Sequence, residues 1–276
     1  MANLTDSKEF LNQLYYGDGG TGKTTHLCHM ADLGPVLIVN AESGLKASAL
    51  KRSGVAISNI ETYPEPGEPI TYAGLESEWK RLNEALAQDP DSYVGVGWDS
   101  VTEIHMMLLK DVVEKALAKA LAQGKDRDEF FTDIADYGKM TEQVRRLMRK
   151  FRDLPCHFGC TALERRDKDN DGKVIYRPAV TPALVNDLYG WFDMVCHTTV
   201  EEFGDQDDQY CGLYRPAGKF RGKDRFRVMP KVLVDPTYDR VLLYVDGTLD
   251  VKSDPVMKQA QEARQAWAAS NEQEQN

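Results

Sequence analysis

A phosphate-binding loop is the clearest chemical feature of the sequence. Residues 17–24 read GDGGTGKT and match the pattern G-x-x-x-x-G-K-[ST]. The glycines let successive backbone N–H groups turn toward a polyphosphate, Lys23 can place its ammonium on the outer phosphates, and the Thr24 hydroxyl can hold Mg²⁺. A helix expected over 23–33 would direct its positive end at the same anion. The pattern predicts binding of a nucleoside triphosphate with Mg²⁺ through Gly17, Asp18, Gly19, Gly20, Thr21, Gly22, Lys23, Thr24 and Thr25.

Two acidic residues follow apolar runs and suit the chemistry of triphosphate hydrolysis. Asp99 closes the run 93–98, where a carboxylate can hold Mg²⁺ through water beside the β- and γ-phosphates. Glu42 follows the run 35–39, and a carboxylate there can orient and polarise the attacking water. Alternatively, Glu42 has a structural role and caps the turn that follows the strand. We predict hydrolysis of a nucleoside triphosphate with Glu42 and Lys23 as catalytic residues, and Thr24 and Asp99 as the magnesium site.

Alternating strand and helix patterns surround these residues, which is typical of an α/β domain with a mostly parallel sheet and helices on both faces. Apolar runs predict strands over 13–16, 35–39, 57–63, 93–98 and 155–161. Helical spacing of apolar residues predicts helices over 23–33, 75–88, 101–121 and 137–151, with one more helix after residue 254. Shorter runs predict an antiparallel C-terminal extension with strands over 174–176, 194–200, 226–228 and 241–245.

The order of these motifs resembles the ATPase core of RecA-type recombinases. A strand, GDGGTGKT, a helix and a strand ending in NAE are followed by a strand ending in WDS, and then by YGKMTEQVRRLMRKF leading into PCHFGCT. The resemblance covers about residues 10–245 and looks closest to small phage-encoded RecA-like ATPases. It implies a RecA-like P-loop NTPase core over residues 1–252, with a C-terminal helix and a flexible polar tail over 253–276.

The resemblance also implies roles for individual residues. Lys23 and Thr24 match the phosphate and magnesium residues of the family, Glu42 matches its catalytic glutamate, and Asp99 matches its Walker B carboxylate. In RecA-like proteins a polar residue at the end of the next strand senses the γ-phosphate. Thr161 is the candidate for that role here, although the usual glutamine or histidine is missing.

Two basic residues near the C-terminal end of the core resemble the element with which RecA subunits reach into a neighbour's ATP site. Lys223 and Arg225 form this pair, and a cation supplied across an interface would make hydrolysis depend on assembly. The alternative is an ordinary solvated turn. The resemblance implies a homo-oligomer, either a filament or a ring.

Two further segments, 120–134 and 164–177, match the DNA-binding loops of the family. Basic side chains for phosphates and aromatic side chains for base stacking are what single-stranded DNA binding requires. The candidates are Lys125, Arg127, Phe130 and Phe131 in the first segment, and Arg165, Arg166, Lys168, Lys173, Tyr176 and Arg177 in the second. Acidic residues lie within both segments, so exposed charged loops are the alternative. Asp171 and Gly172 predict a hairpin turn.

Composition limits the partners and the location. The 276 residues carry a net charge of −10, which argues against a uniformly basic nucleic-acid-binding protein. Positive charge is nevertheless concentrated locally, with seven basic residues and one acidic residue over 215–231. No apolar stretch approaches the length of a membrane span and the first residues are polar, so we expect no membrane partner and a cytoplasmic location, in the host cytoplasm if the protein is phage-encoded.

We therefore predict a Mg·ATP-hydrolysing RecA-like ATPase that binds single-stranded DNA and acts in DNA recombination, annealing or repair. The alternative is a nucleotide-gated assembly protein of a replication or repair complex, which would bind ATP without DNA-stimulated hydrolysis. A P-loop kinase fits less well, because the sequence lacks an arginine-rich lid and Glu42 suits activation of water.

Overall fold

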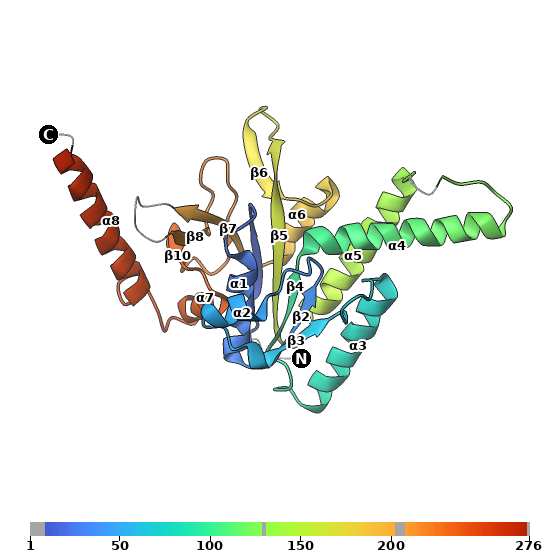
Figure 1. Cartoon of the computed structure of the whole chain (residues 1–276), viewed down its shortest axis with the longest axis horizontal. Helices are drawn as coiled ribbons and strands as arrows, with labels where there is room; N and C mark the ends of the chain where they lie inside the picture. Colours follow the sequence, from blue (N-terminus) through green and yellow to red (C-terminus); the bar gives the residue numbers. More distant parts are fainter. Residues whose placement is uncertain (1–8, 129–130, 202–207, 275–276) are drawn as a thin grey trace, which may run out of the picture.

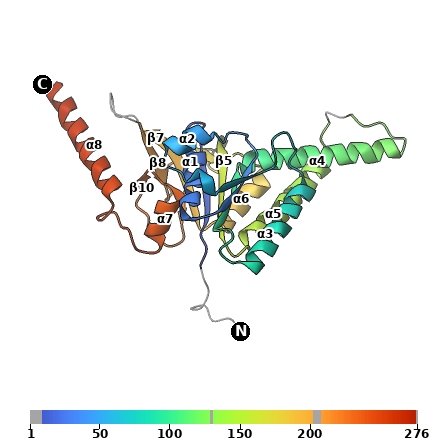
Figure 2. The same ribbon diagram turned by 60° about the horizontal axis from the view of Figure 1, so that its bottom comes forward.

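The structure is a computed structural model of the chain, and it describes residues 9–128, 131–201 and 208–274. Within these ranges the chain forms a central sheet with helices on both faces (Figures 1 and 2). Strands β1 to β5 and β7 contribute the parallel pairs, and strands after residue 156 contribute the antiparallel pairs. The predicted α/β class, with a mostly parallel sheet and an antiparallel C-terminal extension, is confirmed.

The sheet places the phosphate-binding strand near its centre. The strand order is β10-β8-β7-β1-β5-β4-β2-β3, so β5 separates β1 from β4. The parallel strands are β1 (Asn12–Gly17), β2 (Val36–Asn40), β3 (Ile60–Tyr63), β4 (Gly95–Asp99), β5 (His157–Lys168) and β7 (Met194–Glu201). The antiparallel additions are β6 (Val174–Pro178), β8 (Gln209–Leu213), β9 (Lys223–Asp224) and β10 (Val232–Val234). The carboxyl ends of the parallel strands share one edge, where open α/β sheets bind ligands.

In the described residues the two larger hydrophobic cores fill the space between the sheet and its helices, and a small third cluster lies between the sheet and α8 (Pro255–Glu274). One face is covered by α3 (Tyr72–Gln88), α4 (Val101–Ala122), α5 (Ile134–Arg152) and α6 (Pro182–Trp191). There Trp98 packs edge-on against Phe151 and Phe158. The opposite face is covered by α1 (Lys23–Cys28), the 3₁₀ helix η2 (His29–Leu33) and α7 (Tyr238–Val245). Glycine in the sheet allows α1 to approach closely, since a Cβ on Gly159 would lie 2.3 Å from a methyl group of Leu27.

Several predicted elements differ from the structure. The segment 241–245 is not a strand but the end of α7, because Tyr238, Val241 and Tyr244 are buried at helical spacing after Thr237. The segment 226–228 forms no strand, and β9 lies just before it. The predicted strand over 57–63 begins with the short helix η3 (Ile57–Asn59), and α2 (Ala47–Arg52) precedes it. The predicted helix over 23–33 changes to 3₁₀ geometry at His29.

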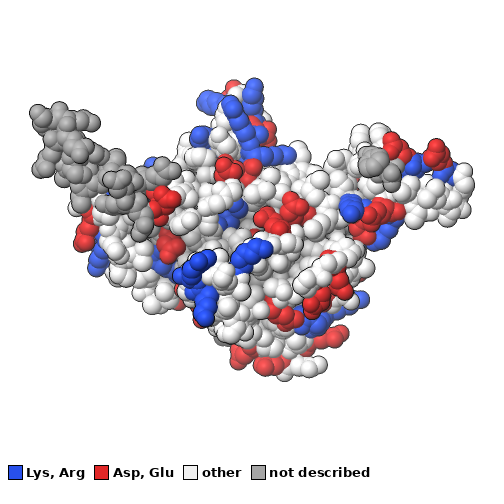
Figure 3. Space-filling model, in the orientation of Figure 1, with Lys and Arg blue, Asp and Glu red and all other residues white. Residues whose placement is uncertain are grey.

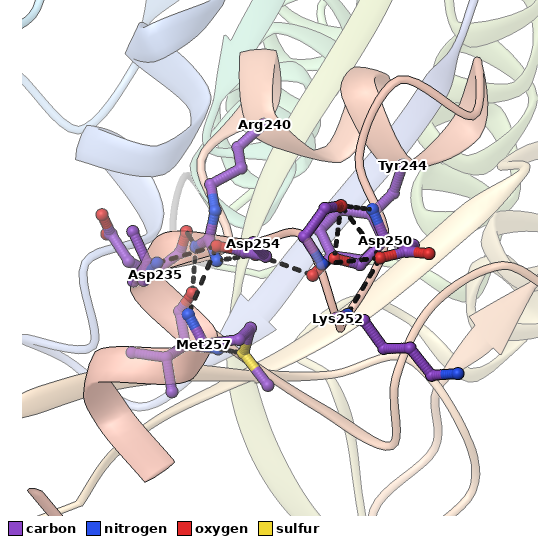
Figure 4. A network of polar contacts seen from close by, with 10 residues as sticks. Asp235, Arg240, Tyr244, Asp250, Lys252, Asp254 and Met257 are labelled. Carbon is purple, nitrogen blue, oxygen red and sulfur yellow. Dashed lines mark hydrogen bonds and ion pairs between the residues drawn. The ribbon is translucent and has the colours of Figure 1, made fainter. Parts of the chain in front are cut away.

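A buried polar network ties α7 to the start of the C-terminal helix α8 (Pro255–Glu274) (Figure 4). Asp254 is fully buried and accepts hydrogen bonds from Arg240 and from the Tyr244 hydroxyl. Arg240 also donates to the backbone oxygens of Val234 and Asp235. The network therefore fixes the path of the chain between β10 and α7.

Three elements project from the body of the molecule. The β5–β6 hairpin rises above the sheet, α4 extends to one side, and α8 runs away on the other side (Figures 1 and 2). None of the helices in the described ranges combines the length and the apolar character that crossing a bilayer demands.

Candidate active site

The phosphate-binding loop connects the end of β1 to the first turn of α1. Gly20 and Gly22 have φ angles of 78° and 79°, a backbone conformation that glycine adopts without strain. Lys23 is largely buried, and its Nζ donates to the Asp18 carbonyl oxygen at 2.6 Å. The Thr21 hydroxyl donates to the same oxygen at 2.9 Å. The loop is therefore closed on itself around the lysine, as a phosphate cradle requires.

Asp99 meets two hydroxyl groups at the end of β4. Thr24 Oγ1 lies 3.0 Å from each of its carboxylate oxygens, and Thr161 Oγ1 donates to Oδ1 at 2.5 Å. Burial raises the pKa of Asp99, while the bonds from Thr161 and Thr24 oppose that rise. Hard oxygen donors from Thr24 and Asp99, beside the loop that would hold the phosphates, fit the ligand preference of Mg²⁺. Thr161 contacts this carboxylate and is itself buried.

Glu42 lies directly beside Asp99 at the end of β4. The backbone N–H groups of Ala41 and Glu42 both donate to the Asp99 carbonyl oxygen, at 2.7 and 3.1 Å, so the end of β2 is fixed to the end of β4. The Glu42 side chain is exposed. Burial lowers the pKa of Lys23, and the negative charges of Glu42 and Asp99 act in the opposite direction. A solvent-facing carboxylate near the loop lysine is suitably placed to orient a water molecule.

The structure adds Thr198 to the site, which sequence reasoning missed. The Thr198 hydroxyl lies 2.7 Å from the Thr21 hydroxyl, and it donates to the Tyr16 carbonyl oxygen. A Cβ on Gly17 would lie 2.5 Å from two oxygens of Thr198, so this position needs glycine. Thr198 belongs to β7, far along the chain from the loop, and no local pattern in the sequence marks it.

A row of side chains runs from the site to the β5–β6 hairpin. Glu164, near the middle of β5, lies 2.7 Å from His197 Nε2. The His197 ring stacks on Phe220 with centroids 4.0 Å apart, and Phe220 lies 5.3 Å from the ring of Tyr176 in β6. Burial lowers the pKa of His197, and the Glu164 carboxylate partly restores it. We call the three rings of His197, Phe220 and Tyr176, together with the Glu164 carboxylate at their end, the aromatic row.

The second predicted DNA segment forms a β-hairpin, which confirms the turn predicted at Asp171 and Gly172 and the strand predicted over 174–176. β5 continues past the sheet and pairs with β6, with Arg165 opposite Arg177 and Arg166 opposite Tyr176. Asp167 lies 3.8 Å from Arg165 and 3.4 Å from Arg177. The hairpin carries Arg165, Arg166, Lys168, Lys173, Tyr176 and Arg177. Figure 3 shows Lys and Arg side chains gathered on this projection, with acidic side chains among them.

The first predicted DNA segment lies at the far end of α4, away from the hairpin (Figure 1). Lys125 and Phe131 are exposed there, and Phe130 lies outside the described residues. Arg127 forms ion pairs with Asp136 and Asp133, so its charge is balanced within the chain. The structure does not bring the two segments together.

The predicted trans pair is engaged within its own chain. Lys223 Nζ donates to the carbonyl oxygens of Tyr189 and Phe192 at 2.8 and 2.7 Å, and Arg225 pairs with Asp193 at 2.7 Å. Lys223 lies opposite Val195, at the amino end of β7. The phosphate-binding loop follows the carboxyl end of the neighbouring β1, so the pair lies away from this chain's own loop.

Together the fold and the site define a P-loop nucleotide-binding protein. The sequence matches the AAA domain family over residues 10–226, and the chain belongs to this family. This membership indicates an ATPase that binds nucleotide, typically with Mg²⁺.

A crystal structure of a KaiC-like protein from the hyperthermophilic archaeon Pyrococcus horikoshii OT3 has 14% sequence identity and a TM-score of 0.43, covering 81% of this chain and 88% of that chain. No curated protein gives a significant match to the sequence.

Proposed function

We propose that the protein is a Mg·ATP-hydrolysing, RecA-like ATPase that binds single-stranded DNA on the β5–β6 hairpin and couples that binding to its nucleotide site. The observation that carries the proposal is the aromatic row. It starts at Glu164, in the strand that also supplies Thr161 to Asp99, and it ends at Tyr176 in the hairpin. A role in recombination, annealing or repair, a phage origin and a cytoplasmic location follow from the resemblance and are part of the proposal.

The placement of the polar groups supports the proposed hydrolysis. Lys23 would bind the outer phosphates, while Thr24 and Asp99 would hold Mg²⁺, which would neutralise charge on the phosphates. Glu42 accepts a hydrogen bond from the attacking water and polarises it. Thr161 holds the Asp99 carboxylate in place through its 2.5 Å hydrogen bond.

The composition of the hairpin supports the proposed binding of nucleic acid. Strand alternation places Arg166 and Lys168 on the face that carries Tyr176. The ammonium of Lys219 lies 4.8 Å from the Tyr176 ring centre and adds positive charge to the same face. Basic groups beside a partly exposed aromatic ring suit a single strand, because phosphates and stacked bases are then bound together.

The decisive experiment is steady-state ATP hydrolysis with and without single-stranded DNA over a salt series. We expect stimulation that fades with salt, because each lysine or arginine contact to a phosphate releases counterions, with a slope of roughly 0.7 per contact for single strands. Arg166→Ala should reduce the affinity for DNA and lower this slope. Lys110→Ala removes an exposed basic residue of α4 and serves as the matched control. ATP hydrolysis without any stimulation by DNA would refute the coupling.

Exposed apolar residues at the end of α4, in the segment that follows it and at the start of α5 favour the second candidate, a nucleotide-gated assembly protein. Ile134 is 91% exposed, and Leu121 and Phe131 are also largely exposed. Apolar side chains on a projection suit contact with another protein surface. If the protein is a nucleotide-gated assembly protein, ATP should change its assembly state, measured by light scattering. DNA should then leave the rate of ATP hydrolysis unchanged.

We also propose a homo-oligomer in which Lys223 and Arg225 act on a neighbour's nucleotide. Arg225 is the more accessible of the two, since about half of its side chain is exposed. Mixing Arg225→Ala with Glu42→Gln should restore activity, because each variant supplies what the other lacks. Absence of restored activity would refute the trans role.

A further inference from the structure

A pocket of about 610 Å³ opens beside the phosphate-binding loop. Its near end is formed by Gly22 and Thr25 of the loop and first helical turn, together with His26 and Tyr210. Tyr210 is 40% exposed, and one of its ring carbons lies 3.0 Å from the position that a Cβ on Gly22 would take. The pocket is therefore continuous with the site proposed for the phosphates, and one of its walls is aromatic.

The pocket contains buried polar atoms that have no partner in the described part of the chain. Both ring nitrogens of His26 and Oδ1 of Asp239 are buried without a hydrogen bond. His26 is only 2% exposed, and its Nδ1 lies 3.8 Å from Asp235, too far for a hydrogen bond. Unpartnered buried polar atoms also occur elsewhere in the described residues, but these three belong to residues that line the same pocket, where a ligand could supply the missing partners.

The far end of the pocket offers acceptors. His29, Asp32 and Asp239 have ligand atoms within 4.8 Å of one another. Asp32 is already engaged, because it contacts His29 Nδ1 at 2.6 Å and accepts from the Ala56 N–H at 2.8 Å. The described residues that line the pocket include four aspartates and no lysine or arginine. Such a wall disfavours another phosphate and favours a group that donates hydrogen bonds.

The distance between the two ends matches a nucleoside. Asp32 follows Thr25 by seven positions along α1 and η2, which corresponds to a rise of roughly 10–13 Å for a helix that changes from α to 3₁₀ geometry. A ribose attached to a phosphate beside Thr25 and followed by a purine would bring the edge of the base to the carboxylate of Asp239.

We infer that this pocket holds the nucleoside of the bound triphosphate and selects a purine with an exocyclic amino group, whose N–H donates to Asp239. The inference rests on the proposed binding of nucleotide by the loop. Tyr210 forms an apolar wall for the nucleoside, and the neutral His26 ring offers one donor and one acceptor. Asp239 is the specificity-determining residue, since Asp32 is already occupied.

The test is equilibrium binding of ATP, of purine riboside triphosphate, which lacks the amino group, and of inosine triphosphate, which has an oxygen in its place. We expect ATP to bind about 10-fold or more tightly than either analogue, because a hydrogen bond to a charged acceptor is lost. Asp239→Asn replaces one acceptor oxygen by a donor, so it should weaken ATP binding and improve inosine triphosphate binding relative to ATP. Asp246→Asn, at the other end of α7, is the matched control.

The outcomes separate this inference from the proposed function. Equal affinity for the three nucleotides in the wild type, with binding still lost in Lys23→Ala, would refute the base selection and leave the loop assignment standing. Binding of no nucleotide would refute both. Binding of Zn²⁺ to the nucleotide-free protein that is lost in Asp239→Asn, with no change in base preference, would assign the cluster to a metal ion and overturn the inference.

Discussion

The buried His26 ring makes the stability of the fold depend on pH in a calculable way. Burial lowers the pKa of this imidazole to about 3, with smaller contributions from the positive charges of His29, Arg240 and Lys23. The unfolded chain has a pKa near 6.5 at this position, so below that pH the unfolded state binds a proton that the folded state does not. The folded state therefore loses stability as the pH falls from 6.5 toward 3, and above 6.5 the effect vanishes.

The magnitude follows from the separation of the two pKa values. At pH 5 the difference spans 1.5 pH units, which corresponds to a loss of about 2 kcal/mol relative to pH 8. Urea unfolding at both pH values, in the wild type and in His26→Phe, isolates the contribution of this one ring, because the other titrating groups cancel in the difference. We expect the wild type to lose about 2 kcal/mol more than the variant. An equal loss in both proteins would refute the assignment of a buried neutral imidazole.

The remaining predictions concern the site and the C-terminal network. Lys23→Ala should abolish ATP binding, measured by calorimetry, and unchanged binding would contradict the loop assignment. Glu42→Gln should keep ATP binding and lose steady-state hydrolysis, because the amide cannot serve as the base; retained turnover would place the base elsewhere. Thr161→Val should lower the free energy of unfolding by about 2 kcal/mol and raise the Mg²⁺ concentration needed for turnover, since the buried Asp99 loses a donor. Asp254→Ala should cost about 3–5 kcal/mol in urea unfolding, because Arg240 is left buried and unpaired; a loss under 1 kcal/mol would show that the pair is dispensable.

The sequence carried enough information for the parallel half of the fold. Continuous apolar runs mark buried strands, and carboxylates directly after two of them had to meet at the carboxyl edge of the sheet. This is why the sequence predicts that Glu42 and Asp99 lie beside the loop, and the structure does bring these groups together.

What the sequence did not reveal depends on contacts between distant segments. Thr198 and His197 reach the site only because β7 pairs with β1, and nothing local to residues 194–201 indicates that neighbour. The segment 241–245 is rich in residues that favour strands, yet burial of Tyr238, Val241 and Tyr244 on one side makes it helical. Tertiary packing therefore overrides the local preference of this segment for a strand.

The unbroken course of β5 has a consequence for how the chain can vary in length. One strand of twelve residues carries Thr161 inside the sheet and Arg166 in the hairpin. Because side chains alternate between the two faces, inserting or deleting a single residue between them would turn every hairpin side chain to the opposite side. A change of two residues would keep the faces and move the tip by about 6.6 Å. Viable relatives of this chain should therefore differ between these two positions by even numbers of residues.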